Sequence, residues 1–159
     1  MIPRYRVWIK EEKCFADCIE TIRYYAKEIV LSRGGICEID CFDFEDVIFT
    51  QSTGLKDKNG KEIFEGDILK FNDEWAEYCY EGYVDGSVEG INYVEVVRSE
   101  ACFEFGKTKF PDSSLFILME DERLNFKDLI KSEDFGFEIL GNIYENPELL
   151  EVENETKTN

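Results

Sequence analysis

Short stretches of alternating apolar and polar residues run through much of this chain. In residues 3–9, Tyr5, Val7 and Ile9 alternate with Arg4, Arg6 and Trp8. A period of two residues is typical of a β-strand with one buried face. Other short strand-like segments lie at residues 36–44, 47–51, 68–71 and 135–144, and residues 101–114 should contain a short strand and a loop. We therefore expect about eight short strands and a mainly β fold with little helix.

Residues 14–31, with the sequence CFADCIETIRYYAKEIVL, fit two kinds of element. Their apolar side chains share one helical face, namely Phe15, Cys18, Ile19, Ile22, Tyr25, Ala26 and Ile29. Isoleucine, threonine, tyrosine and valine dominate the segment, however, and these residues favour strands. Periodicity alone therefore leaves helix and strand open here.

The C-terminal third contains three further elements. Residues 115–119, LFILM, form a continuous apolar run of strand length, and we expect a strand buried on both faces. Residues 121–134 place leucine and isoleucine with helical spacing, which predicts a short helix near 121–131. A small helix should follow Asn146, because asparagine is a good N-cap and Pro147 suits a first turn.

Residues 53–71, TGLKDKNGKEIFEGDILKF, contain the clearest turn signals in the chain. Gly54 and Gly66 can take positive φ without steric cost. Asn59-Gly60 is the preferred pair for a two-residue type I′ turn, which predicts a hairpin. The residues of this stretch thus serve backbone geometry, and we interpret it as scaffold.

The following residues 72–97 are strand-like, but Gly82, Gly86 and Gly90 should interrupt them. This region is also acidic: residues 72–104 contain nine acids and one base, Arg98. A second acidic cluster, EIDCFDFED, occupies residues 38–46. Such runs are usually solvated strand faces, whereas catalysis would require two carboxylates that converge in a pocket.

Length and charge limit the organisation and the partners. The 159 residues fit one domain, which we assign to residues 1–150, and residues 151–159 lack apolar anchors and should fray. A formal net charge of −18 disfavours binding to nucleic acid or to an anionic membrane, and favours basic proteins or cations. No secretion signal and no membrane-length apolar run are visible, so we expect a cytoplasmic protein.

The residues that usually carry chemistry are scarce. The chain has no histidine, which removes the commonest general base and the Ser-His and Cys-His pairs. Cys14, Cys18, Cys37 and Cys41 form two C-x3-C pairs that could hold zinc. The same spacing suits small buried hydrophobes, and we favour core packing for these four and for Cys79 and Cys102. We predict no cofactor and no enzymatic activity.

Two segments together resemble the signature stretches of the YopX family. They are TGLKDKNGKEIFEGDILKF at residues 53–71 and EILGNIYENPELL at residues 138–150, and the opening RYRVWIKEEKCF also fits. The resemblance implies a mostly β fold with an SH3-like barrel element, additional hairpins and one or two short helices, and it favours strands for residues 14–31. It also implies a phage or prophage origin and a host cytoplasm, and it allows a homo-oligomer. It supplies no catalytic residues, and residues 72–135 form a divergent, acidic middle segment.

Two functions from different classes fit these features. The first is a non-enzymatic phage accessory protein that binds a host or phage protein through Trp75, Tyr78 and Tyr80 together with Asp73, Glu74 and Glu77. Core packing is the alternative role of these aromatic residues. The second is an inhibitor whose carboxylates imitate DNA phosphates and occupy a host nucleic-acid-binding or defence protein.

Overall fold

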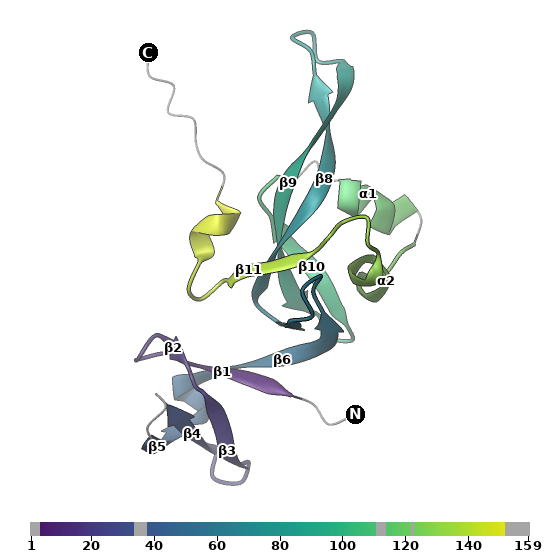
Figure 1. Cartoon of the computed structure of the whole chain (residues 1–159). Helices are drawn as coiled ribbons and strands as arrows, with labels where there is room; N and C mark the ends of the chain where they lie inside the picture. The colour runs from purple at the N-terminus through teal and green to yellow at the C-terminus, as the bar shows by residue number, and fades with distance from the viewer. Residues whose placement is uncertain (1–3, 34–37, 111–113, 122, 152–159) are drawn as a thin grey trace, which may run out of the picture. The chain divides into compact units, whose positions relative to one another are not determined.

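The computed structural model describes residues 4–33, 38–110, 114–121 and 123–151 (Figure 1). It is mainly β, with 54% strand, 15% helix, a curled half-barrel sheet and two short α-helices, so the expected fold class is confirmed. The contacts divide the chain into two compact units, Met1–Ser52 and Thr53–Asn159. A single domain over residues 1–150 stays a prediction, and each unit is described by itself.

The first unit consists of two groups of antiparallel strands. Its elements are β1 (Tyr5–Ile9), β2 (Cys14–Phe15), β3 (Cys18–Arg23), β4 (Glu28–Arg33), β5 (Glu38–Asp43), the 3-10 helix η1 (Phe44–Asp46) and the start of β6 (Val47–Lys56). Strand β1 lies between β2 and β6, and β4 lies between β3 and β5. The expectation of strands within residues 14–31 is therefore confirmed. The core of the unit comprises Val7, Ile9, Ile29, Leu31 and Val47.

The second unit is built on a four-stranded antiparallel sheet in the order β10-β9-β8-β11. Its elements are β7 (Glu62–Phe64), β8 (Asp67–Tyr78), β9 (Val84–Arg98), β10 (Phe103–Thr108), α1 (Ser114–Asp121), α2 (Phe126–Lys131), β11 (Glu138–Asn142) and the 3-10 helix η2 (Pro147–Leu150). Both α-helices add apolar side chains to the core of this unit, where Phe71, Phe105 and Phe137 pack with Leu115 and Leu129.

The turn at residues 57–61 differs in type from the predicted one. Asn59 is not among the described non-glycine residues with positive φ, whereas Gly60 has a φ of 80°. A type I′ turn needs positive φ at both central residues, so that prediction is wrong. The buried carboxylate of Asp57 instead organises the turn, because its Oδ1 accepts hydrogen bonds from the Asn59 and Lys61 backbone N–H groups, each at 2.9 Å.

The two signature segments pack against each other. Strand β8 pairs with β11, and the other oxygen of Asp57 accepts a hydrogen bond from Ile139 N at 3.0 Å. Lys58 Nζ lies 3.2 Å from Glu138 Oε2, and its hydrogen bond and charge lower the pKa of Glu138. A Cβ on Gly66, which has a φ of 85°, would meet the Tyr144 ring at 3.1 Å. These contacts support the interpretation of residues 53–71 as scaffold.

Three expectations for local structure are wrong. Residues 115–119 lie in helix α1, where Leu115 is buried and Ile117 is exposed, and they do not form a strand. Gly86 and Gly90 lie within β9 and do not interrupt it, whereas Gly82 does lie in the turn before β9. Asn146 precedes η2, but its side chain makes no cap hydrogen bond to that helix.

The helix expected near residues 121–131 is present but shorter. Helix α2 begins at Phe126, and its N-cap is Asn125, whose Oδ1 accepts a hydrogen bond from Asp128 N at 3.0 Å. Leu129 and Ile130 are buried, as their spacing indicates. The tail at residues 152–159 lies outside the described residues.

Candidate interaction site

The most distinctive surface of the second unit is the far part of the β8–β9 hairpin, which we call the acidic arm and define as residues 73–90. Strand β11 pairs with β8 only as far as Lys70, and β10 pairs with β9 only as far as Val94. Beyond these points β8 and β9 pair with each other, from Asp73↔Gly90 to Tyr78↔Val84. Within the described chain, the arm is therefore a two-stranded ribbon that extends beyond the sheet (Figure 1).

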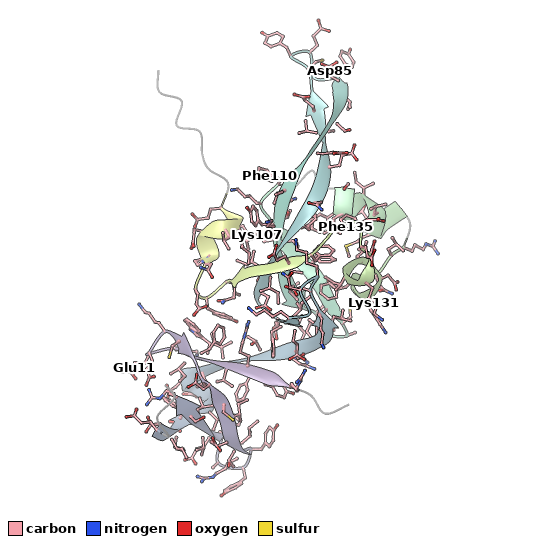
Figure 2. All side chains as sticks on the ribbon, in the orientation of Figure 1. Glu11, Asp85, Lys107, Phe110, Lys131 and Phe135 are labelled. Atoms are coloured by element: carbon pink, nitrogen blue, oxygen red, sulfur yellow. The ribbon has the colours of Figure 1, made fainter. Side chains whose placement is uncertain are left out.

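The arm carries negative charge on exposed side chains. Its exposed acids are Glu74, Glu77, Glu81, Asp85 and Glu89, and residues 72–97 contain no lysine or arginine. Asp85 lies toward the far end of the arm, away from Phe110 and Phe135 at its base (Figure 2). The chemistry available here is binding of a positively charged surface, because carboxylates attract cations at short range.

The tip of the arm adds aromatic surface to this charge. Tyr80 is fully exposed and Tyr83 is 71% exposed, and both lie in or beside the turn that joins β8 to β9. That turn is held by a backbone hydrogen bond from Cys79 N to Tyr83 O at 2.8 Å. Exposed tyrosines are common in protein interfaces, since each combines a large apolar ring with a hydroxyl group.

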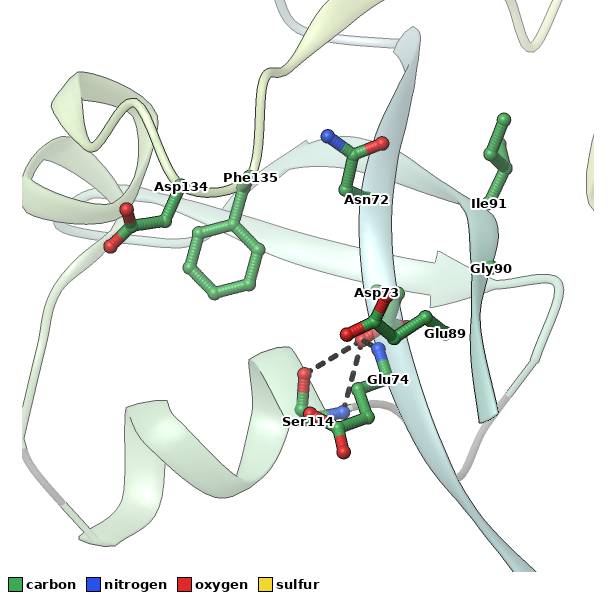
Figure 3. Close-up of a pocket in the computed structure, with 9 residues that line it drawn as sticks. All are labelled: Asn72, Asp73, Glu74, Glu89, Gly90, Ile91, Ser114, Asp134 and Phe135. Atoms are coloured by element: carbon green, nitrogen blue, oxygen red, sulfur yellow. Dashed lines mark hydrogen bonds between the residues drawn. The ribbon is translucent and has the colours of Figure 1, made fainter. Parts of the chain in front are cut away.

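The buried carboxylate of Asp73 fixes the base of the arm. Its Oδ1 accepts hydrogen bonds from Ser114 N at 3.1 Å and from Ser114 Oγ at 2.8 Å, which ties β8 to the first residue of α1 (Figure 3). The same oxygen accepts a hydrogen bond from Glu74 N at 2.8 Å. Asp73 is 6% exposed, so it serves to position the arm rather than to contact a partner.

Asn92 extends this network into β9. Its Nδ2 donates to Asp73 Oδ2 at 2.7 Å and to Phe110 O at 3.0 Å. Its Oδ1 accepts from Tyr93 N, Thr108 Oγ1 and Phe110 N. Asn92 is completely buried, and both the nitrogen and the oxygen of its side-chain amide form hydrogen bonds. These bonds connect β8, β9 and the segment at Phe110 at the base of the arm.

A cavity of about 560 Å³ lies beside the base of the arm (Figure 3). Acidic side chains from β8, from β9 and from the segment before β11 line it, and the ring of Phe135 lies in its wall. The lining residues are Asn72, Asp73, Glu74, Glu89, Gly90, Ile91, Ser114, Asp134 and Phe135. Glu74 and Glu89 are direct cross-strand partners, and such like charges repel each other.

The structure brings together only part of the predicted interaction set. Glu74, Glu77 and Tyr80 are exposed on the arm, as an interface requires. Asp73 differs from the expectation, because it is buried and bonded to α1. The backbones of Trp75 and Tyr78 lie in β8, but their side chains are outside the described part of the structure.

The cysteines depart from the expected core positions. Cys18, Cys41 and Cys102 are exposed and Cys14 and Cys79 are half-buried, so core packing is wrong for the three exposed thiols. For Cys14, burial raises the pKa of the thiol, and Glu12 raises it further. Cys37 lies outside the described residues. Among the residues that are described, no three acidic, cysteine or histidine side chains are grouped so that they could hold a metal ion.

The other acidic cluster, residues 38–46, lies in β5 and η1. Most of its side chains are exposed, and Asp40 forms an ion pair with Arg33 of the neighbouring strand. It therefore fits the solvated strand face that the sequence suggests.

Sequence reasoning missed the residues at the base of the arm. Asn92, Ser114 and Phe135 are far apart in the chain, and none carries a motif. Only the pairing of β8 with β9 and the docking of α1 bring Asn92 and Ser114 to Asp73. No local signal could have identified them.

Comparisons with known proteins give matches over nearly the whole chain. A family model described as YopX protein matches residues 4–151. The crystal structure of protein EF1440 from Enterococcus faecalis is 28% identical, with a TM-score of 0.55, and the match covers 95% of this chain and 99% of that one. The crystal structure of protein yopX from Bacillus subtilis is 20% identical, with a TM-score of 0.49 and coverage of 92% and 97%. No curated protein matches the chain.

Among the described residues, no helix combines the length and the apolar character that a membrane-crossing helix needs.

Proposed function

Since this chain belongs to the YopX protein family, we propose its function from the surface that this fold presents. The family match also confirms the resemblance of the two signature segments. The protein is a non-enzymatic accessory protein of a phage or prophage, and it acts in the host cytoplasm. It binds a host or phage protein that has a basic surface, and the acidic arm is the binding element.

One observation carries this proposal. The arm extends beyond the sheet as a ribbon with five exposed carboxylates, no base and an exposed tyrosine at its tip. An isolated two-stranded ribbon is marginal in water, and here buried bonds at Asp73 and Asn92 hold its base. Because its base is held in this way, the arm loses less conformational freedom on binding than an unanchored ribbon would, which favours association.

Charge-reversal variants test the proposal. The arm variant Glu77→Lys/Glu81→Lys/Asp85→Lys reverses charge on the arm, and the control variant Glu11→Lys/Glu20→Lys/Glu148→Lys makes the same net change at exposed positions elsewhere. Each tagged protein is used to capture partners from a lysate of the bacterial host at low salt and at about 0.5 M salt, where charges are screened within a few ångströms.

We expect the wild type and the control variant to retain the same basic protein, and the arm variant to lose it. High salt should weaken the capture, because exposed ion pairs are screened. Capture of the same proteins by the arm variant would overturn the proposal. If duplex DNA competes for the captured protein, the alternative function as an acidic DNA mimic is favoured instead.

A further inference from the structure

The hydrogen-bond pattern of the sheet shows which backbone groups of β8 face away from β9. Asn72 N donates to Phe135 O at 2.8 Å, so the Asn72 backbone points out of the β8–β9 ladder. In an antiparallel pair, alternate residues point their N–H and C=O groups toward the partner and away from it. The register is continuous from Ile68↔Glu95 to Glu77↔Gly86, so Glu74 and Ala76 also point outward.

The opposite edge of the arm follows the same rule. Tyr93 O accepts a hydrogen bond from Lys109 N at 3.0 Å, and Tyr93 is the cross-strand partner of Lys70. Alternation from Tyr93 places the backbone groups of Ser87 on the outer edge of β9. Ala76 and Ser87 are direct partners, so they are equivalent positions on the two edges of one ribbon.

The β8 edge has a feature that distinguishes it from the β9 edge. Among the described residues, the backbone hydrogen bond from Asn72 N to Phe135 O is the last that this segment makes along β8 toward the arm. The cavity begins there, with Glu74 on one side and Asp134 and Phe135 on the other. An added strand along β8 would start beside this cavity, where carboxylates and an aromatic ring suit a lysine or arginine side chain.

We propose that the partner contributes an extended basic segment, which adds as a strand to the β8 edge of the arm from Glu74 to Tyr78 and places a lysine or arginine side chain at the cavity. This inference rests on the proposed function and specifies how the arm binds. Backbone hydrogen bonds to the open edge give affinity in strand addition, and side-chain pockets give specificity.

Charge selects this occupant over a second copy of the chain. The edge carries acids and no base, and charged edge strands oppose pairing with an identical edge. A basic segment is instead attracted to this acidic edge. Its side chains also reduce the repulsion between the opposed carboxylates of Glu74 and Glu89.

Two proline variants of the full chain test the binding mode. Ala76→Pro removes an N–H group that faces outward on β8, and Ser87→Pro removes its counterpart on β9. Neither substitution removes a hydrogen bond of the β8–β9 ladder, and proline is tolerated on such edges. The probe is a short peptide in which lysine and threonine alternate, and a second peptide carries N-methyl groups on its backbone amides.

Binding is measured by fluorescence anisotropy at low salt, and circular dichroism verifies that each variant is folded. We expect Ala76→Pro to weaken binding of the lysine–threonine peptide about tenfold, because a backbone hydrogen bond is lost and the proline ring blocks the edge. Ser87→Pro should bind like the wild type, and the N-methylated peptide should bind poorly to all three proteins.

The possible failures are distinguishable. If Ser87→Pro weakens binding and Ala76→Pro does not, the assignment to the β8 edge is overturned. If both proline variants and the N-methylated peptide bind normally while the arm charge-reversal variant does not, strand addition is overturned and the proposed function survives. If the charge-reversal variant also binds the peptide normally, both proposals fail.

Discussion

Buried aspartates organise the backbone of this strongly acidic protein. Asp57, Asp67 and Asp73 are each less than a tenth exposed, and each accepts a hydrogen bond from a backbone N–H group. Asp57 closes a turn, Asp67 bonds to Phe64 N, and Asp73 holds the start of α1. The total number of acidic residues therefore exceeds the number of carboxylates at the surface. Acids next to each other in sequence also differ in role, since Asp73 is buried and Glu74 is exposed.

Replacement of Asp73 tests this view at the scale of one residue. Asp73→Ala removes the acceptor of Ser114 N and Ser114 Oγ and leaves the buried amide of Asn92 with one partner fewer. We expect the free energy of unfolding to fall by about 2–3 kcal/mol, as is typical when buried polar groups lose partners. Glu77→Ala is the control on the same strand, because Glu77 is exposed and should change stability little. Urea denaturation of both variants measures the difference, and equal midpoints would contradict the role of Asp73.

At the scale of elements, most strands follow from alternation, whereas helix α1 does not. The run LFILM has the length of a buried strand, and a short apolar run of this kind does not distinguish strand from helix. The helix is favoured here because Asp73 accepts the N–H of its first residue and because Leu115, Leu118 and Met119 share one side that faces the core. Both reasons depend on strand β8, which lies about 40 residues earlier in the chain.

The turn between β6 and β7 allows a test with a matched glycine. Gly60 has a φ of 80°, and a Cβ added to it would meet no atom within 4 Å. Gly86 lies in β9 with equally open space for a Cβ but without positive φ. Gly60→Val should destabilise the protein by about 1–2 kcal/mol, because a β-branched residue is strained at positive φ. Gly86→Val should be neutral or stabilising, because valine favours strands. Thermal denaturation compares the two, and an unchanged melting temperature for Gly60→Val would refute the turn geometry.

At the scale of the whole molecule, the formal net charge of −18 is the dominant property. Self-repulsion of this size destabilises a compact state, and salt screens it because the Debye length falls from about 30 Å at 0.01 M to about 8 Å at 0.15 M. We therefore expect the melting temperature to rise by several degrees between these two salt concentrations. Differential scanning calorimetry in sodium chloride measures it, and a melting temperature that falls with salt would show that ion pairs outweigh repulsion.

The sequence by itself determined the class of fold, the scaffold character of residues 53–71 and the acidity of residues 72–104, since these depend on local alternation, on glycine and on composition. The tertiary structure alone decided that Asp73 is buried while Glu74 beside it is exposed, that Gly86 and Gly90 lie within a strand, and that LFILM is helical. It also decided that, within the described residues, β8 has no strand partner but β9 beyond Lys70, and β9 has none but β8 before Val94. The physical reason is that burial and hydrogen-bond partners depend on Asn92, Ser114 and Phe135, residues that only folding brings to β8.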